Sequence, residues 1–413
     1  MFKNKLIMIQ IKLKHFIVNF LSISFAIFLC FLLTNFIFIK ISHQKLFPRS
    51  LAGSLPNILF TFYGDTYSKK SLKKYTAILG GSYAQGGGDA YLNRVYDYSI
   101  AHHLNKIDKK NYLNFARAGF GSISATSNLI NIYNLSNFSN SIEDLEKPNS
   151  IIFFFNEDYL LEANINEYRL FGKQNQDISD FVINRINDKL QFSSTEKIAN
   201  NFPLILFISK IGSHIKDFFS AVIENPKKTK SLLTDRLKKL FGHTIILKSN
   251  LDSKKNLDKN INSIKNYSKV KNIPPLSGAS LNLTKDEISL ALEIFKDSIK
   301  FLKSWSKIDN ISIVYIPSPI TSYTWNEPIN YQISGTIEVR HVTNEKNKIN
   351  NIFIRKIIKE FSENNEIQFL DLTDHIIKIS ENKILHGPLD WLHLNYDGYK
   401  SAASYIIEND KKN

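Results

Sequence analysis

Thr-Ala-Ile-Leu-Gly-Gly-Ser-Tyr-Ala-Gln-Gly-Gly-Gly, residues 76–88, begins as an apolar run and ends in glycines around a single serine. The apolar part extends back to Tyr75, and a segment that can form a helix follows the glycines. A short apolar run that ends in glycine and serine is typical of a buried strand followed by a tight turn. The pattern therefore predicts a strand at 75–79 with Ser82 just beyond its C-terminal end.

Further apolar runs of the same kind follow along the chain, and each is predicted to be a strand. They lie at 112–116, 150–155, 311–316 and 367–372. Segments with helical periodicity separate them, at 90–104, 122–133, 284–302, 352–361 and 396–407. Alternating strands and helices with apolar strands indicate a parallel sheet with helices on both sides. We therefore expect an α/β fold around a five-stranded parallel sheet.

The region 159–283 interrupts this alternation, because it has no clear succession of strands and turns. Apolar residues recur at helical spacing between 204 and 222, and lysines and arginines gather between 227 and 239. We interpret the region as a largely helical insertion within a domain that spans 75–413. Packing of the apolar stripe on the main domain is the expected role, with a lid or a membrane-facing helix as the alternative. The basic cluster is expected to be a solvated surface, with contact to anionic lipid head groups as the alternative.

The chain begins with a long apolar run at 16–39 that contains no charged residue. As a helix it would reach about 36 Å at about 1.5 Å per residue, enough to cross a hydrocarbon core of about 30 Å. We expect an uncleaved transmembrane signal anchor, followed by a linker at 40–74. Basic residues are slightly more numerous before the run, which favours a cytoplasmic N-terminus at 1–15 and a domain outside the cytoplasm.

Charge and cysteine content narrow the function classes. The formal net charge is +15, but the basic residues are scattered rather than striped, so nucleic acid is not expected as a partner. Cys30 is the only cysteine, which excludes an intramolecular disulfide and a cysteine-based metal site. The histidines, including His341 and His386, show no metal-ligand spacing, and we expect neither a metal nor another cofactor.

An aspartate and a histidine stand close together near the C-terminus, in Leu-Asp-Trp-Leu-His-Leu-Asn at 389–395. On a loop, the carboxylate of Asp390 can turn toward the imidazole of His393, fix its tautomer and stabilise the imidazolium. His393 can then accept the proton of Ser82, whose hydroxyl is a weak nucleophile without a base. The three residues predict nucleophilic catalysis.

Two more polar turns follow strands of the predicted sheet. Gly119 comes after the second strand and Asn156 after the third, just as Ser82 comes after the first. Ligand sites in parallel sheets gather beyond the carboxyl ends of the strands. Each motif is weak alone, and their combination carries the prediction of a site at this edge.

These residues resemble the SGNH (GDSL-like) hydrolase superfamily. Ile-Leu-Gly-Gly-Ser-Tyr-Ala-Gln-Gly at 78–86 looks like its nucleophile block, and Asn-Phe-Ala-Arg-Ala-Gly-Phe-Gly at 114–121 is similar to its second block. Asp-Trp-Leu-His-Leu-Asn-Tyr-Asp-Gly at 390–398 looks like its last block. The resemblance implies a three-layer α/β/α sandwich with a flavodoxin-like sheet. It also implies a triad of Ser82, His393 and Asp390, and an oxyanion hole formed by Ser82, Gly119 and Asn156.

The chain departs from the family pattern in two places. Gly81 replaces the aspartate that usually precedes the serine, at a position to which the resemblance assigns no triad role. The third block reads Phe-Asn-Glu-Asp at 155–158, so that either Asn156 or Glu157 falls at the oxyanion position. A carboxylate there would repel the developing negative charge, and we therefore expect Asn156 to be the donor.

The expected function is serine-dependent hydrolysis of an acyl ester, or transfer of the acyl group to a hydroxyl. An anchored domain outside the cytoplasm favours the O-acetyl groups of cell-envelope or exported polysaccharide as substrates. Two alternatives stay open. One is an esterase resembling lipases or lysophospholipases, and the other is an inactive, membrane-anchored binding or scaffold protein with the same fold.

Overall fold

A computed structural model of the chain describes residues 2–43, 73–93, 98–136, 145–190, 204, 264–265, 267, 273–308, 310–332 and 338–410. Most of the predicted linker at 40–74 lies outside the described residues. So do the basic cluster at 227–239 and, except for Leu204, the apolar stripe at 204–222.

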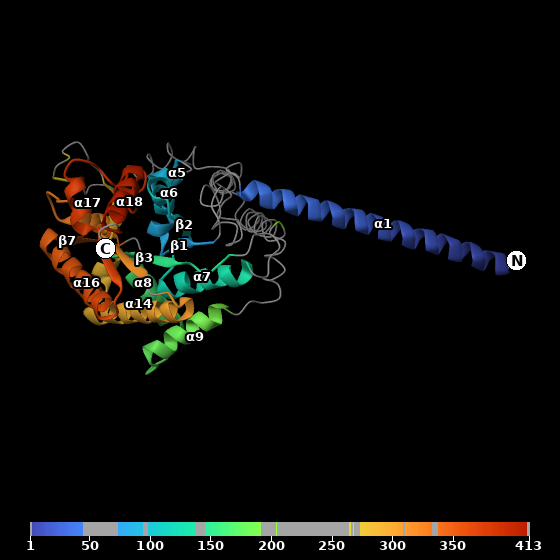
Figure 1. The fold of residues 1–413 in the computed structure, drawn as a ribbon, viewed down its shortest axis with the longest axis horizontal. Helices are drawn as coiled ribbons and strands as arrows, with labels where there is room; N and C mark the ends of the chain where they lie inside the picture. Colours follow the sequence, from blue (N-terminus) through green and yellow to red (C-terminus); the bar gives the residue numbers. More distant parts are fainter. Residues whose placement is uncertain are drawn as a thin grey trace.

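The described residues form an α/β domain around a central sheet of five strands (Figure 1). The strands are β1 (Tyr75–Leu79), β2 (Asn111–Asn114), β3 (Ser150–Asn156), β5 (Ile311–Ile316) and β8 (Gln368–Asp371). Their order across the sheet is β2-β1-β3-β5-β8, and every neighbouring pair is parallel. The predicted five-stranded parallel sheet is therefore confirmed.

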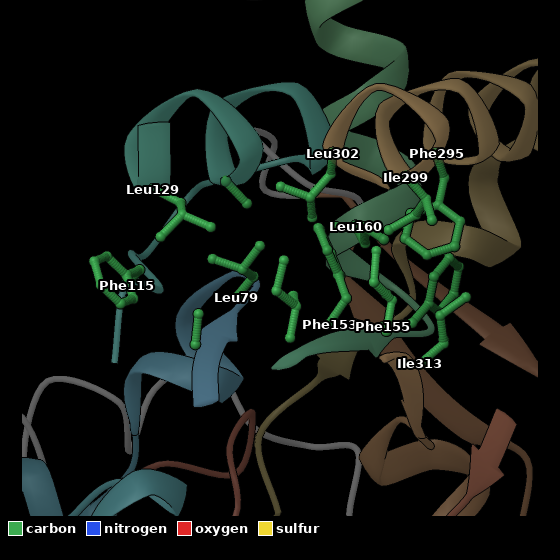
Figure 2. Close-up of a cluster of buried hydrophobic side chains, with 14 of the residues drawn as sticks. Leu79, Phe115, Leu129, Phe153, Phe155, Leu160, Phe295, Ile299, Leu302 and Ile313 are labelled. Carbon is green, nitrogen blue, oxygen red and sulfur yellow. The ribbon is translucent and has the colours of Figure 1, made fainter. Parts of the chain in front are cut away.

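Apolar residues face both sides of the sheet, which explains why the strands read as continuous apolar runs. In β1, Leu79 enters one hydrophobic cluster while its neighbour Ile78 enters the other. Figure 2 shows the first cluster, in which Phe153, Phe155 and other sheet residues meet side chains of two helices above them. Successive side chains of a strand point to opposite faces, so each strand contributes to two cores.

Different helices contribute to the two clusters. The first cluster receives side chains from α7 (Ser122–Ser136), α8 (Tyr159–Phe171), α14 (Lys285–Ser306) and α16 (Asn344–Asn364). The second receives them from α6 (Ile100–Ile107), α17 (Thr373–Ser380) and α18 (Tyr396–Asp410). The start of α14 forms a capping box, since Thr284 accepts from the Glu287 amide and Glu287 accepts from the Thr284 amide.

The single helix predicted at 90–104 is wrong. The structure has the short helix α5 (Asp89–Leu92) and then α6, which begins only at Ile100. Ser99 is extended, with φ −98° and ψ 161°, and its side chain accepts from the amide of His102. A serine in that conformation starts a new helix rather than continuing an old one.

A second, smaller sheet was not predicted. Along the chain, its strands come between strands of the main sheet. Its strands are β4 (Leu276–Ser277), β6 (Ile329–Gln332) and β7 (Val339–Val342), in the order β4-β6-β7. The insertion at 159–283 begins with α8 and α9 (Ile178–Leu190), and its last part carries β4 and the 3-10 helix η3 (Ala279–Asn282). The prediction of a largely helical insertion therefore omitted β4.

The N-terminal helix α1 (Phe2–His43) extends away from the domain (Figure 1). Its segment Ile17–Phe38 has a mean hydropathy of 2.4, and most of its side chains are exposed, whereas Asn35 and Phe38 near its C-terminal end are buried. A helix of this length and composition can cross a bilayer, and a signal sequence has the same properties.

Candidate active site

Ser82 is the first residue of α4 (Ser82–Gln85), a single helical turn that follows β1 directly. Gly80 makes the sharp change of direction, with φ +139°, and a Cβ there would lie 2.9 Å from the carbonyl oxygen of Phe154. Both the conformation and the space therefore require glycine at this position. The amides of Gly86 and Gly87 close the turn on the carbonyl of Ser82.

Hydrogen bonds join this turn to the segment after β2. Asn114 donates through Nδ2 to the carbonyl of Ala84 at 3.0 Å, and Gln85 accepts through Oε1 from the amide of Ala118 at 2.6 Å. The amide of Arg117 donates to the carbonyl of Gly80. The segment that carries Gly119 is thus fixed beside the serine turn.

The loop before α18 brings the predicted acid and base to Ser82. Nε2 of His393 lies 2.8 Å from Oγ of Ser82, and Nδ1 of His393 lies 2.7 Å from Oδ2 of Asp390. A carboxylate can only accept, so Nδ1 carries the proton and Nε2 accepts from the serine hydroxyl. Although burial raises the pKa of Asp390, the hydrogen bond and charge of His393 outweigh it, and the pKa lies below its ordinary value.

The imidazole of His393 is enclosed by backbone and aromatic rings. A Cβ on Gly87 would lie 3.0 Å from Nε2, so the glycine backbone packs directly against the ring. The ring of Tyr83 is tilted against it at 4.9 Å between centroids, and that of Tyr159 lies parallel to it at 6.2 Å. The hydroxyl of Tyr83 also donates to the carbonyl of Leu392. These contacts hold the imidazole in one orientation.

The base of the same loop is held by Tyr323, which lies between β5 and β6 along the chain. Its hydroxyl accepts from the amides of Leu385 and His386, at 2.9 and 3.0 Å, and donates to Nδ1 of His386. Burial lowers the pKa of His386 to about 3, so this histidine is neutral at ordinary pH.

Asn156 is the last residue of β3 and Glu157 follows it, and the two side chains face different surroundings. The Oδ1 atom of Asn156 accepts from the amides of Asp158 and Tyr159, while its Nδ2 is buried and finds no acceptor among the described residues. The carboxylate of Glu157 is buried against the segment after β5, where it accepts a hydrogen bond from the amide of Ser318 at 3.0 Å. Of the two side chains, only that of Asn156 therefore has an N–H donor that could bind a ligand.

Gly119 adopts φ +78°, a conformation that favours glycine. A Cβ built on it would meet no atom within 4 Å, so the residue borders open space. A Cβ on Gly81, next to Ser82, would lie 3.3 Å from the carbonyl oxygen of Phe120. The close approach of Gly81 and Phe120 shows that the residue following Gly119 lies beside the turn that carries Ser82.

The sequence did not single out several residues that shape this site. Asn114 and Gln85 lay inside quoted motifs without an assigned role, and nothing in the sequence linked Gly87, Tyr83 or Tyr159 to His393. Contacts of this kind join residues far apart in the chain and have no local pattern. Within the described part of the chain, no three His, Cys, Asp or Glu side chains gather in a way that could hold a metal ion.

No family model matches the chain, and a search of curated proteins finds no match either.

Proposed function

We propose that the protein is a serine-dependent acyl ester hydrolase or O-acyltransferase of the SGNH type. The chain of hydrogen bonds from Ser82 through His393 to Asp390 is the observation that carries this proposal. A serine, a base and an orienting carboxylate in this arrangement recur in nucleophilic catalysis on unrelated folds. The strand order also supports it: counted along the chain, the strands of the main sheet lie in the flavodoxin-like order 2-1-3-4-5. A three-layer α/β/α sandwich is therefore the proposed architecture.

In the proposed mechanism, Oγ of Ser82 attacks the acyl carbon and its proton passes to Nε2 of His393. Asp390 holds the imidazole in the required tautomer and stabilises the imidazolium that forms. His393 then gives the proton to the leaving alcohol, and an acyl-enzyme remains on Ser82. Water or a second alcohol, deprotonated by His393, then attacks the acyl group, and His393 returns the proton to Oγ of Ser82 as the bond between Oγ and the acyl carbon breaks.

The negative charge on the carbonyl oxygen needs donors in the transition state. We propose the backbone amides of Ser82 and Gly119 and the Nδ2 atom of Asn156 in this role. The buried, unpartnered state of Nδ2 supports the choice of Asn156, and the engagement of Glu157 with Ser318 argues against a carboxylate at this position. One donor of this type contributes about 2.7 to 4 kcal/mol to the stabilisation of the transition state.

We propose acylated glycans as substrates, with O-acetyl groups of cell-envelope or exported polysaccharide first among them. The support is α1, which is long and apolar enough to anchor the domain, together with the excess of basic residues before it. With the domain outside the cytoplasm, the site would face such polymers. Membrane attachment through this one helix is part of the same proposal.

The test is carried out on the full chain in detergent with p-nitrophenyl esters of increasing acyl length and a serine-reactive fluorophosphonate. We expect turnover of the short esters and labelling, both lost in Ser82→Ala. Ser401→Ala is the matched control, because Oγ of Ser401 lies 2.9 Å from Nε2 of His375 in a second Ser–His pair. Turnover and labelling that persist in Ser82→Ala would refute the proposal. A preference for long acyl chains would favour a lipase, and turnover only with a sugar acceptor would favour transfer.

A further inference from the structure

Asp89 is a buried carboxylate that bonds to the loop carrying Asp390. Its side chain is 6% exposed. Its Oδ1 accepts from the amide of Asp390 at 2.7 Å, and both of its oxygens accept from the amide of Leu389 at 3.1 Å. Asp89 begins α5, a few residues after Ser82. The segment that presents the serine therefore also holds the backbone of the aspartate.

The loop at 381–395, which carries Asp390, lies near the surface, and in the described part of the chain the side chains of Asp89, Tyr83 and Tyr323 bond to its backbone. Leu389 is 38% exposed. Tyr83 bonds to the carbonyl of Leu392 and Tyr323 bonds to the amides at the loop's base. Of these three side chains, Asp89 is the one that bonds to residue 390 itself.

The surroundings of Asp89 act on its pKa in opposite directions. Burial raises the pKa of Asp89, the two amides lower it, and the nearby charge of Asp390 raises it again. Two carboxylates placed close together in a protein interior repel each other. The two amides of residues 389 and 390 are thus the groups that favour the ionised form of Asp89 in this buried place, and in turn the carboxylate holds both amides.

We propose that Asp89 is a positioning residue, which fixes Asp390 and, through it, the imidazole of His393 relative to Ser82. The effect of Asp89 on rate rests on the function proposed above, whereas its effect on the position of the ring does not. Catalytic groups displaced by about 1 Å lose about 10²-fold in rate. Asp89 therefore acts through Asp390 and does not itself touch the substrate.

The experiment compares Asp89→Asn and Asp89→Ala with the wild type as full chains in detergent. In Asp89→Asn the side-chain oxygen can still accept from the amide of Asp390. The new NH₂ group, however, faces the amide N–H of Leu389, and two donors cannot bond to each other. We expect kcat to fall about 10-fold in Asp89→Asn and about 10²-fold in Asp89→Ala, with KM nearly unchanged. In Asp390→Ala, adding Asp89→Ala should cause no further loss, since residues that act as a unit are not additive.

A second readout does not depend on turnover. The proton on Nδ1 of His393, bonded to Asp390, should give a downfield proton resonance that Asp89→Ala broadens or removes. Asp371→Asn is the matched control: Asp371 also accepts from a backbone amide, that of Thr373 at 2.8 Å, and should change neither readout. An unchanged resonance in Asp89→Ala, or losses that add to those of Asp390→Ala, would overturn the proposal. A wild type that shows the resonance but no Ser82-dependent turnover would refute the proposed function and leave the positioning role standing.

Discussion

Gly87→Ala should displace the imidazole of His393 without any change in a chemical group of the site. Gly87 has no positive φ, so alanine can adopt its backbone conformation. The new Cβ, however, would lie 2.9 Å from Cδ2 and 3.0 Å from Nε2 of His393. Carbon atoms pack at about 3.5 to 4.0 Å, so the ring must retreat by roughly 0.5 to 1 Å.

This retreat acts directly on the hydrogen bond between His393 and Ser82. The bond is 2.8 Å long, and a separation near 3.6 Å is no longer a hydrogen bond. A misplacement of about 1 Å lowers rates about 10²-fold. At about 1.36 kcal/mol per factor of ten, the barrier rises by about 2.7 kcal/mol.

The assay is kcat/KM on a short p-nitrophenyl ester, together with the rate of fluorophosphonate labelling and a thermal melt. The matched control is Gly172→Ala, in which the new Cβ would lie 2.8 Å from the ring of Tyr168 at the far end of α8. It should lower stability and leave kcat/KM unchanged. If Gly87→Ala folds and keeps the wild-type kcat/KM, the packing of Gly87 against the ring does not position the base.

Asn156→Asp keeps the acceptor for the amides of Asp158 and Tyr159 but removes Nδ2, so steady-state kinetics should show kcat lower by at least about 10²-fold at similar KM. An unchanged kcat would exclude Asn156 as an oxyanion donor. His386 has a pKa of about 3 in the folded protein, below the ordinary 6.5, so the unfolded chain binds a proton that the folded protein does not. Stability should therefore fall as pH drops from 6.5 toward 3, by at most about 1.4 kcal/mol per pH unit from this group, and urea unfolding of His386→Asn should lack this contribution. Equal pH slopes for the two proteins would contradict the assignment.

The main sheet could be predicted from the sequence because its central strands β1, β3 and β5 are buried on both faces. Continuous apolar runs mark such strands, and β1 and β5 begin and end where the sequence placed them. The small sheet was missed because β4, β6 and β7 have only two to four residues each, too few to show a period. The break between α5 and α6 was missed because Ser99 lies inside a helix-like pattern and starts a helix only in context.

Some residues of the candidate site could likewise be predicted from the sequence, and others could not. Ser82, Asp390 and His393 stand in local motifs, so the sequence could name them together, and the structure places Ser82 and Asp390 each within hydrogen-bond distance of His393. Their catalytic role stays a prediction. Asp89 and Gly87 touch the C-terminal loop only through the fold, and no local pattern joins positions about 300 residues apart in the chain.

The choice between Asn156 and Glu157 shows what the fold adds to such motifs. Neighbouring residues at a strand end point to opposite sides, so a shift of one residue in the motif exchanges the two side chains. Glu157 turns to Ser318 and Thr321, which supply its hydrogen bonds, and it has no need of a ligand. Asn156 turns the other way, and its buried Nδ2 finds no acceptor among the described residues, a state that costs about 1 to 3 kcal/mol. A negatively charged oxygen bound beside Ser82 would remove that cost, and it would do so most strongly in the transition state, when the charge on the oxygen is largest.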